Sequence, residues 1–181
     1  MKNFCKGFTI IELLVTMSVI AIVSGIALLN FHTGNENLAL QRAANKVAQD
    51  IRRAADLSIQ AEQDTYCGGT LSGYGLYADM VTTDSYIMYA NCNGVAKEGY
   101  DSSSDVIVET IVLDDSVVIK DISTPTNALG VSFFPPDPRA ALCKNDSCPG
   151  ESSASITLAL KGDPSKTKVV QINKGGFPDV N

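Results

Sequence analysis

The sequence predicts an α+β protein, in which a long N-terminal α-helix packs on a mainly antiparallel β domain. Two observations lead to this fold class. Up to about residue 63, an apolar run is followed by apolar residues at helical spacing, and from residue 65 the chain consists of short runs rich in β-branched and aromatic residues. No helical pattern separates these runs, so the strands are expected to pair mainly antiparallel.

The apolar run spans residues 8–31 and contains a single charged residue, Glu12. As a helix, its 24 residues would extend about 36 Å, enough to cross a hydrocarbon core of about 30 Å. Lys2 and Lys6 precede the run, which favours a cytoplasmic N-terminus and export of the rest of the chain. A carboxylate within such a run is costly in lipid, so Glu12 requires a functional explanation.

Two simpler interpretations of the run exist. A secretory signal peptide would be cleaved near the small residues Gly25 and Ala27, and an uncleaved anchor would keep the whole run. Both explain the lysines and the export. Neither explains Glu12, and the run is longer than the usual apolar part of a signal peptide.

The next segment, residues 32–64, is predicted to be the amphipathic half of the same helix, which would run from about residue 9 to about residue 63. Gly34 weakens the helical pattern locally. One face is formed by Leu40, Ala44, Val47, Ile51, Ala54 or Ala55, and Ser58. The charged residues fall largely elsewhere, on a solvated face or in salt bridges between subunits: Arg42, Lys46, Asp50, Arg53 and Asp56.

Residues 65–181 are predicted to form the β domain. Two aromatic runs, 73–79 and 84–92, are separated by four residues and predict an antiparallel hairpin. The Pro-rich stretch 135–138 is predicted to be a turn. Further strands are expected at 105–113, 116–122, 130–135, 153–160 and 167–177.

Four cysteines follow the apolar run, in a Ser-, Thr- and Gly-rich region, and predict two disulfides in an oxidising compartment. Three connectivities are possible. We favour Cys67 with Cys92, which would close the open end of the hairpin, and Cys143 with Cys148. A metal site is not expected, because no two cysteines have CxxC spacing and His32, the one histidine, is distant in sequence.

The start of the chain carries a more specific pattern. Lysines, then Gly7, Phe8 and an apolar stretch with Glu12, resemble the signature of type IV pilins and type II secretion pseudopilins. In that family a prepilin peptidase cleaves after the glycine and methylates the new N-terminal residue. The resemblance therefore implies a leader at 1–7, cleavage between Gly7 and Phe8, N-methylation of Phe8, and Glu12 as fifth residue of the mature chain.

This resemblance suggests a role for Glu12. Its carboxylate would neutralise the N-terminal ammonium of a neighbouring subunit inside an apolar helix bundle, where an unpaired charge is costly. The order of the later segments also resembles the GspH/FimT-like minor pseudopilins and minor pilins, through the aromatic hairpin around Gly73 and Gly75 and the connection at 91–101. The two disulfides and the acidic charge are not required by that branch.

Other chemistries have less support. With a single histidine at the expected membrane edge, no Ser-His-Asp or Cys-His site is available to the β domain, so no enzymatic activity and no cofactor are expected. Calcium could be held near Asn91, Asn93, Asp101 and Asp105, but a solvated turn is favoured because the spacing is not that of an EF-hand.

The net charge of −6 argues against nucleic acid as a partner. The basic concentration near the C-terminus consists of Lys161, Lys166, Lys168 and Lys174, which we interpret as guards of an edge strand.

The sequence therefore predicts a minor pilin or pseudopilin in the inner membrane, single-pass with its N-terminus in the cytoplasm and its β domain periplasmic or extracellular. The expected partners are the prepilin peptidase, other pilin or pseudopilin subunits and the membrane. The alternatives are a major pilin, a minor pilin for DNA uptake, and an uncleaved membrane-anchored binding or enzymatic domain.

Overall fold

The computed structural model describes residues 9–60, 66–69, 71–92, 99–123, 127–135, 137–143, 148 and 152–181, without the side chains of 27–34 and 137–139. One long helix, α1 (Ile10–Gln60), precedes nine strands, so the predicted α+β class is confirmed. The chain forms two compact units, Met1–Asn37 and Leu38–Asn181. The strands are β1 (Gly73–Asp79), β2 (Ser85–Asn91), β3 (Val106–Val112), β4 (Val117–Ile122), β5 (Ala128–Phe134), β6 (Asp137–Cys143), β7 (Ser153–Leu160), β8 (Thr167–Asn173) and β9 (Pro178–Val180).

The helix is continuous through Gly34, so the local weakness in the pattern does not end it. From residue 38 onward, α1 buries one face, as its apolar repeat predicts. The members of that face are at most 4% exposed: Leu40, Ala44, Val47, Ile51, Ala54 and Ser58. They recur every three or four residues and therefore form one stripe along the helix.

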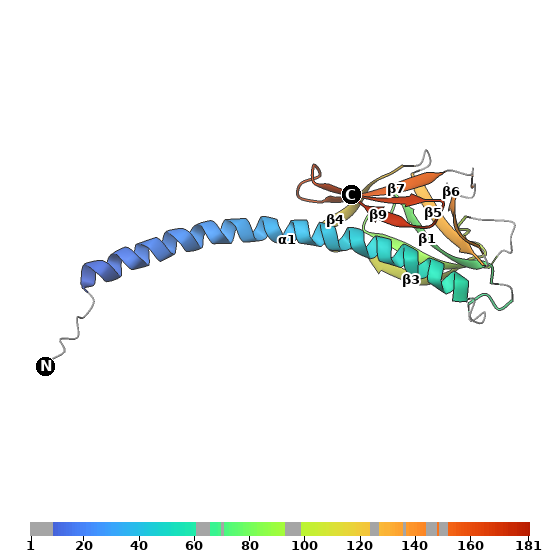
Figure 1. Cartoon of the computed structure of the whole chain (residues 1–181), viewed down its shortest axis with the longest axis horizontal. Coiled ribbons are helices and arrows are strands. Elements are labelled where there is room, and N and C mark those ends of the chain that lie inside the picture. The colour runs from blue at the N-terminus through green and yellow to red at the C-terminus, as the bar shows by residue number, and fades with distance from the viewer. Residues whose placement is uncertain are drawn as a thin grey trace. The chain divides into compact units, whose positions relative to one another are not determined.

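The strands form two antiparallel sheets (Figure 1). The first contains five strands in the order β3-β2-β1-β5-β6, and the second contains four in the order β4-β7-β8-β9. Backbone hydrogen bonds join the sheets at both ends: Ile119 N donates to Thr83 O at 2.7 Å, and Ala140 N donates to Lys174 O at 3.0 Å. The β domain is therefore a single packed body.

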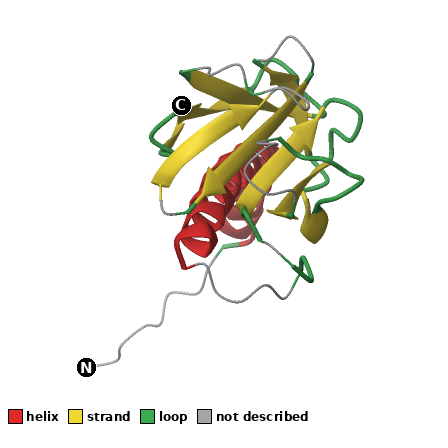
Figure 2. Cartoon of the chain, turned by 90° about the vertical axis from the view of Figure 1, so that its right-hand side faces the viewer, coloured by secondary structure: helices red, strands yellow, loops and turns green. Residues whose placement is uncertain are grey.

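The core lies between α1 and both sheets. Figure 2 shows the strands on one side of the helix. Alternate residues of each strand point toward it, because successive side chains of a strand face opposite sides. The first sheet contributes Leu76, Met88 and Val131, and the second contributes Ile156 and Val170.

The other face of the first sheet is also covered, by the connection from β2 to β3. The ring of Tyr100 lies 4.8 Å from that of Tyr77 and 5.0 Å from that of Tyr89. Tyr89 is fully buried and its hydroxyl lies 2.6 Å from Ser132 Oγ. A Cβ on Gly75 would lie 2.6 Å from Tyr89 Cζ, so the absence of a side chain at Gly75 makes room for the ring.

The predicted hairpin is confirmed, with Gly73 opposite Asn91 and Gly75 opposite Tyr89. Two strands were not predicted. β6 includes Pro138, within the stretch predicted as a turn, and the proline is tolerated because β6 is the end strand of the first sheet. β9 has only three residues and pairs with β8 through Val170 and Val180.

Candidate functional site

The start of α1 has a defined cap. Glu12 N lies 3.1 Å from Thr9 O and 3.3 Å from Thr9 Oγ1, and Leu13 N donates to Thr9 O at 3.2 Å. Thr9 therefore caps the helix, with Glu12 three residues later in the spacing of a capping box. A carboxylate in the first turn also interacts favourably with the helix dipole. This local role of Glu12 was not predicted.

The segment after the cap is apolar on every side. Each large apolar residue from Ile10 to Ile26 is at least 54% exposed, all around the helix. Soluble monomers rarely expose a contiguous apolar surface of this extent, so the surface is one that binds other molecules. Within the described residues, no helix combines the length and the apolar character needed to cross a membrane.

The predicted processing site, Gly7 and Phe8, lies outside the described residues, as does the rest of the leader. The first described residue, Thr9, directly follows it. Glu12 is exposed, one turn from the start of the described chain. The structure thus places Glu12 at the apolar end of α1, far in sequence from the β domain.

Most charged residues predicted away from the core face of α1 are exposed as expected, and one of them, Asp50, is not. Asp50, predicted on the charged side, is only 6% exposed and accepts a hydrogen bond from Tyr86 at 2.7 Å. Lys46 Nζ lies 3.4 Å from the same carboxylate oxygen. Asp50 lies at the border of the buried stripe of α1, where Tyr86 of β2 contacts it. The prediction that Asp50 lies on the charged side was therefore wrong.

Arg53, predicted on a solvated face or in salt bridges between subunits, is exposed, as is its neighbour Arg52, and both also make contacts within the chain. Arg53 pairs with Glu109 of β3 at 2.8 Å, and Arg52 donates to Pro178 O at 3.3 Å. Each holds α1 to an edge strand. The polar face of the helix is thus partly used for folding.

Two disulfides are present, Cys67–Cys92 and Cys143–Cys148, in the pairing favoured from the sequence. The first closes the open end of the β1–β2 hairpin. The second joins the last residue of β6 to a cysteine five positions further along the chain. Cysteines in disulfides are typical of exported proteins.

The acidic residues considered for calcium organise the β2–β3 connection. Asp105 accepts hydrogen bonds from Cys92 N at 3.1 Å and from Asp101 N at 2.8 Å. Asp101 in turn accepts from Ser103 N at 2.9 Å. Asn93 lies outside the described residues. These carboxylates bind backbone amides, which is the arrangement of a capped turn.

The C-terminal lysines do not guard an edge. Lys168 lies in β8, which is paired with β7 on one side and β9 on the other, so this interpretation is corrected. Lys166 lies 3.9 Å from Asp163 within the β7–β8 turn. Lys120, which was not predicted to take part, donates to Pro164 O at 2.9 Å in the same turn.

One protein-family model matches the start of the chain. Residues 2–28 match the prokaryotic N-terminal methylation motif. The resemblance drawn from the first residues is therefore confirmed for this N-terminal motif.

Among solved structures, the type IV minor pilin FimU of Pseudomonas aeruginosa is similar in two crystal forms. The P21 form has 12% identity and a TM-score of 0.48, over 83% of this chain and 92% of that chain. The P65 form has 12% identity and a TM-score of 0.46, over 78% of this chain and 92% of that chain. No curated protein matches the sequence.

Proposed function

We propose that this chain is a structural subunit, a minor pilin or pseudopilin, of a type IV pilus or a type II secretion pseudopilus. The observation that carries the proposal is the N-terminal methylation motif at 2–28, on a helix whose first part exposes apolar side chains on every side. Such a helix requires lipid before assembly and other apolar helices after it. The proposal gives the chain no catalytic role.

The proposed processing removes residues 1–7 by cleavage between Gly7 and Phe8, followed by methylation of Phe8. Residues 8–31 then anchor the subunit in the inner membrane, with the lysines of the leader on the cytoplasmic side. The last residues of this run, 27–31, lie beyond residue 26, the last residue in the first part of α1 whose side chain the structure describes. The two disulfides support a periplasmic or extracellular position for residues 65–181.

Glu12 is proposed to act in assembly. Cleavage would leave an ammonium on Phe8, and methylation would keep its charge. In an apolar bundle, Glu12 of one subunit can pair with that ammonium of the next, and a wrong register would leave both charges unpaired. The exposure of Glu12 on a helix that is otherwise apolar supports this role.

Within the family, we place the chain with the GspH/FimT-like minor subunits, on the aromatic β1–β2 hairpin and the long connection that follows it. The machine is proposed to be a pilus or a secretion pseudopilus. The alternative is a membrane-anchored domain whose anchor is not cleaved. Analysis of the N-terminus for cleavage distinguishes it from this proposal.

The test is the intact mass of the protein from the native membrane and from the sheared surface fraction, with N-terminal fragmentation. We expect the loss of residues 1–7, one methyl group on Phe8, and two hydrogens missing for each of the two disulfides. A protein that keeps Met1, or that begins after Ala27, would contradict the proposal.

A further inference from the structure

The two sheets have four end strands, β3, β4, β6 and β9. An end strand leaves backbone groups that can pair with another chain, and proteins usually block them. In an antiparallel ladder, alternate residues turn both N–H and C=O away from the neighbouring strand. These outward groups show which ends of the sheets are closed.

Contacts within the chain close β4 and β6. On β4, Ile119 N donates to Thr83 O at 2.7 Å, in the turn between β1 and β2. On β6, Ala140 N donates to Lys174 O at 3.0 Å, directly after β8. Each bond ties the end strand to the other sheet. A further strand cannot add at these positions without breaking the bond.

β9 is closed by its own residues and by α1. Its register with β8 makes Pro178 and Val180 the residues that face outward. Pro178 has no N–H, and its carbonyl accepts a hydrogen bond from Arg52 at 3.3 Å. Val180 N lies 3.1 Å from Asp179 Oδ1. Both outward positions of β9 are therefore blocked to an added strand.

β3 is different. Leu113 N donates to Asp84 O at 2.8 Å, so these two opposite residues form a hydrogen-bonded pair of the β2–β3 ladder. Thr110 and Val112 occupy the alternate positions, are exposed, and turn N–H and C=O away from β2. Within the described part of the chain, no hydrogen bond is present at these outward groups. The edge of β3 is therefore open at two successive outward positions.

The side chains of β3 do not block this edge. The strand carries one charged residue, Glu109, which pairs with Arg53 at 2.8 Å. Free charges on an edge are a common barrier to strand addition. Ile107 is 49% exposed and Val112 is 66% exposed. The first sheet thus ends in a strand rich in β-branched residues with apolar side chains at the surface.

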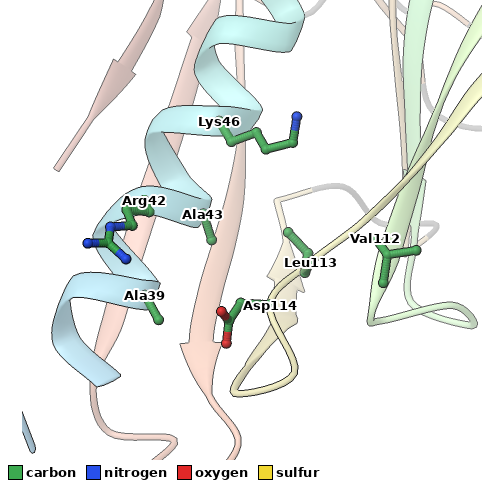
Figure 3. A pocket seen from close by; sticks show the side chains of 7 residues that line it. All are labelled: Ala39, Arg42, Ala43, Lys46, Val112, Leu113 and Asp114. Carbon is green, nitrogen blue, oxygen red and sulfur yellow. The ribbon is translucent and has the colours of Figure 1, made fainter. Parts of the chain in front are cut away.

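A pocket of about 140 Å³ lies beside the open edge, between α1 and the end of β3. Its apolar wall is formed by Ala39, Ala43, Val112 and Leu113 (Figure 3). The charges of its rim are compensated within the chain, because Lys46 pairs with Asp50 at 3.4 Å and Arg42 lies across the rim from Asp114. What the pocket offers to a partner is therefore its apolar wall.

We propose that β3 binds an extended segment of another polypeptide, which adds to the first sheet as a further strand. The backbone of that segment pairs with the outward groups of Thr110 and Val112, and one of its apolar side chains enters the pocket. In this mode of binding, main-chain hydrogen bonds give affinity and pockets for alternate side chains give selectivity. The segment is thus recognised by an extended backbone with apolar residues at alternate positions.

The identity of the partner rests on the proposed function. A minor subunit is surrounded by other subunits rather than by its own copies, so the segment belongs to a different pilin-like subunit. Pairing between two copies of β3 would instead give a symmetric dimer.

The first test uses the full-length chain in detergent and a synthetic peptide with the sequence of residues 84–91. This sequence pairs with β3 on its other side in the fold, so its side chains suit those of β3. With the peptide at about 1 mM, where weak complexes form, hydrogen exchange at the Thr110 and Val112 amides should slow at least about tenfold. The same peptide with N-methylated amides should protect neither, because its methyl groups keep the two backbones apart. Unchanged exchange with the unmodified peptide would overturn the inference.

Two variants test the edge itself. Val112→Pro removes an outward N–H without removing a bond to β2, so it should weaken peptide binding about tenfold, the effect of losing one hydrogen bond. Val112→Lys keeps the backbone and places a charge at the edge, and it should weaken binding at least as much. Val81→Lys is the matched control, since Val81 is 91% exposed in the β1–β2 turn, and it should bind like the unaltered chain. Equal binding by all three variants would contradict a site on β3.

The second test examines the assembled chain from its native host. Exchange at Thr110 and Val112 should be at least about tenfold slower in the sheared surface fraction than in the membrane fraction. A photo-reactive benzophenone side chain in place of Thr110 should cross-link to a different pilin-like subunit. A cross-link to a second copy of this chain, or to lipid, would overturn the assignment of the partner.

The outcomes separate this inference from the proposed function. If the unaltered chain is absent from the sheared fraction, the proposed function fails, and peptide binding in detergent still decides whether β3 accepts a strand. If the chain is present there but Thr110 and Val112 exchange as fast as in the membrane, only the inference about β3 fails.

Discussion

The hydroxyl of Tyr86 on β2 donates a 2.7 Å hydrogen bond to Oδ2 of Asp50 on α1. Both residues are buried, 36 positions apart in sequence. This bond satisfies a carboxylate that would be costly to leave unpaired between helix and sheet. It therefore selects one register of α1 on the first sheet.

Tyr86→Phe should destabilise the β domain by about 1–3 kcal/mol, because Asp50 keeps its burial and loses a donor. Chemical unfolding of the full-length chain in detergent would measure this. Tyr66→Phe is a control, since Tyr66 is 43% exposed. An unchanged unfolding midpoint for Tyr86→Phe would contradict a role of the bond in stability.

The same pair predicts a loss of stability at alkaline pH. Burial, then the hydrogen bond to Asp50 and its charge, raise the pKa of Tyr86 above the usual value. The unfolded tyrosine loses its proton near pH 10, so the stabilisation is complete below about pH 10 and is lost as the pH rises further.

Unfolding midpoints between pH 7 and pH 11 should therefore fall more steeply for the unaltered chain than for Tyr86→Phe. Both proteins contain Lys46, so the difference between their pH profiles reports the contribution of Tyr86. Burial also raises the pKa of Tyr89, which leaves part of the alkaline slope in the variant. Parallel pH profiles would contradict the prediction.

Gly75→Ala should destabilise the first sheet by about 1–3 kcal/mol. The new Cβ would lie 2.6 Å from Tyr89 Cζ, so the ring must move away from Ser132. Gly162→Ala is the matched control, because nothing lies within 4 Å of a Cβ there. Thermal unfolding of both variants gives the comparison, and equal midpoints would show that Tyr89 moves freely.

Removal of the first disulfide should cost more than removal of the second. The cysteines are 25 residues apart in Cys67–Cys92 and 5 apart in Cys143–Cys148. Loop-closure entropy then gives about 3.5 and about 2 kcal/mol, respectively. Paired Cys→Ser variants, compared by thermal unfolding, measure the order. The reverse order would mean that chain entropy is not the main contribution.

The two roles considered for Glu12 can be separated by charge. Glu12→Gln keeps a side chain that can complete the capping box but removes the charge, whereas Glu12→Ala removes both. If pairing with a neighbouring ammonium is the function, both variants should reach the membrane and neither should enter filaments. Quantifying the chain in membrane and sheared fractions checks this. Normal assembly of Glu12→Gln alone would assign Glu12 to capping.

Much of the fold follows from local patterns. The stripe from Leu40 to Ser58 is buried as its spacing predicts, because a helix of this period presents those positions on one side. The boundaries of β1 and β7 match the predicted runs, since alternating β-branched and aromatic residues are typical of a pleated, half-buried surface. The N-terminal motif was recognised for the same reason, as a local pattern.

Contacts between distant segments were not predictable in this way. Pro138 was assigned to a turn, but its strand lies at a sheet edge, a position that depends on the pairing of β5 with β6. The cover of Tyr100 over Tyr89 depends on how the β2–β3 connection folds back over the sheet. Sequence spacing does not encode such neighbours.

By itself, the sequence determined the fold class, the N-terminal motif, the long helix with its apolar first part and Glu12, and most of the strands, because these depend on residues close together in the chain. Only the tertiary structure decided that Asp50 is buried against Tyr86, and that Arg52 and Arg53 contact end strands of different sheets. The physical reason is that the burial and pairing of a side chain depend on the segment that packs against it. The order of the strands in the sheets determines which segment that is.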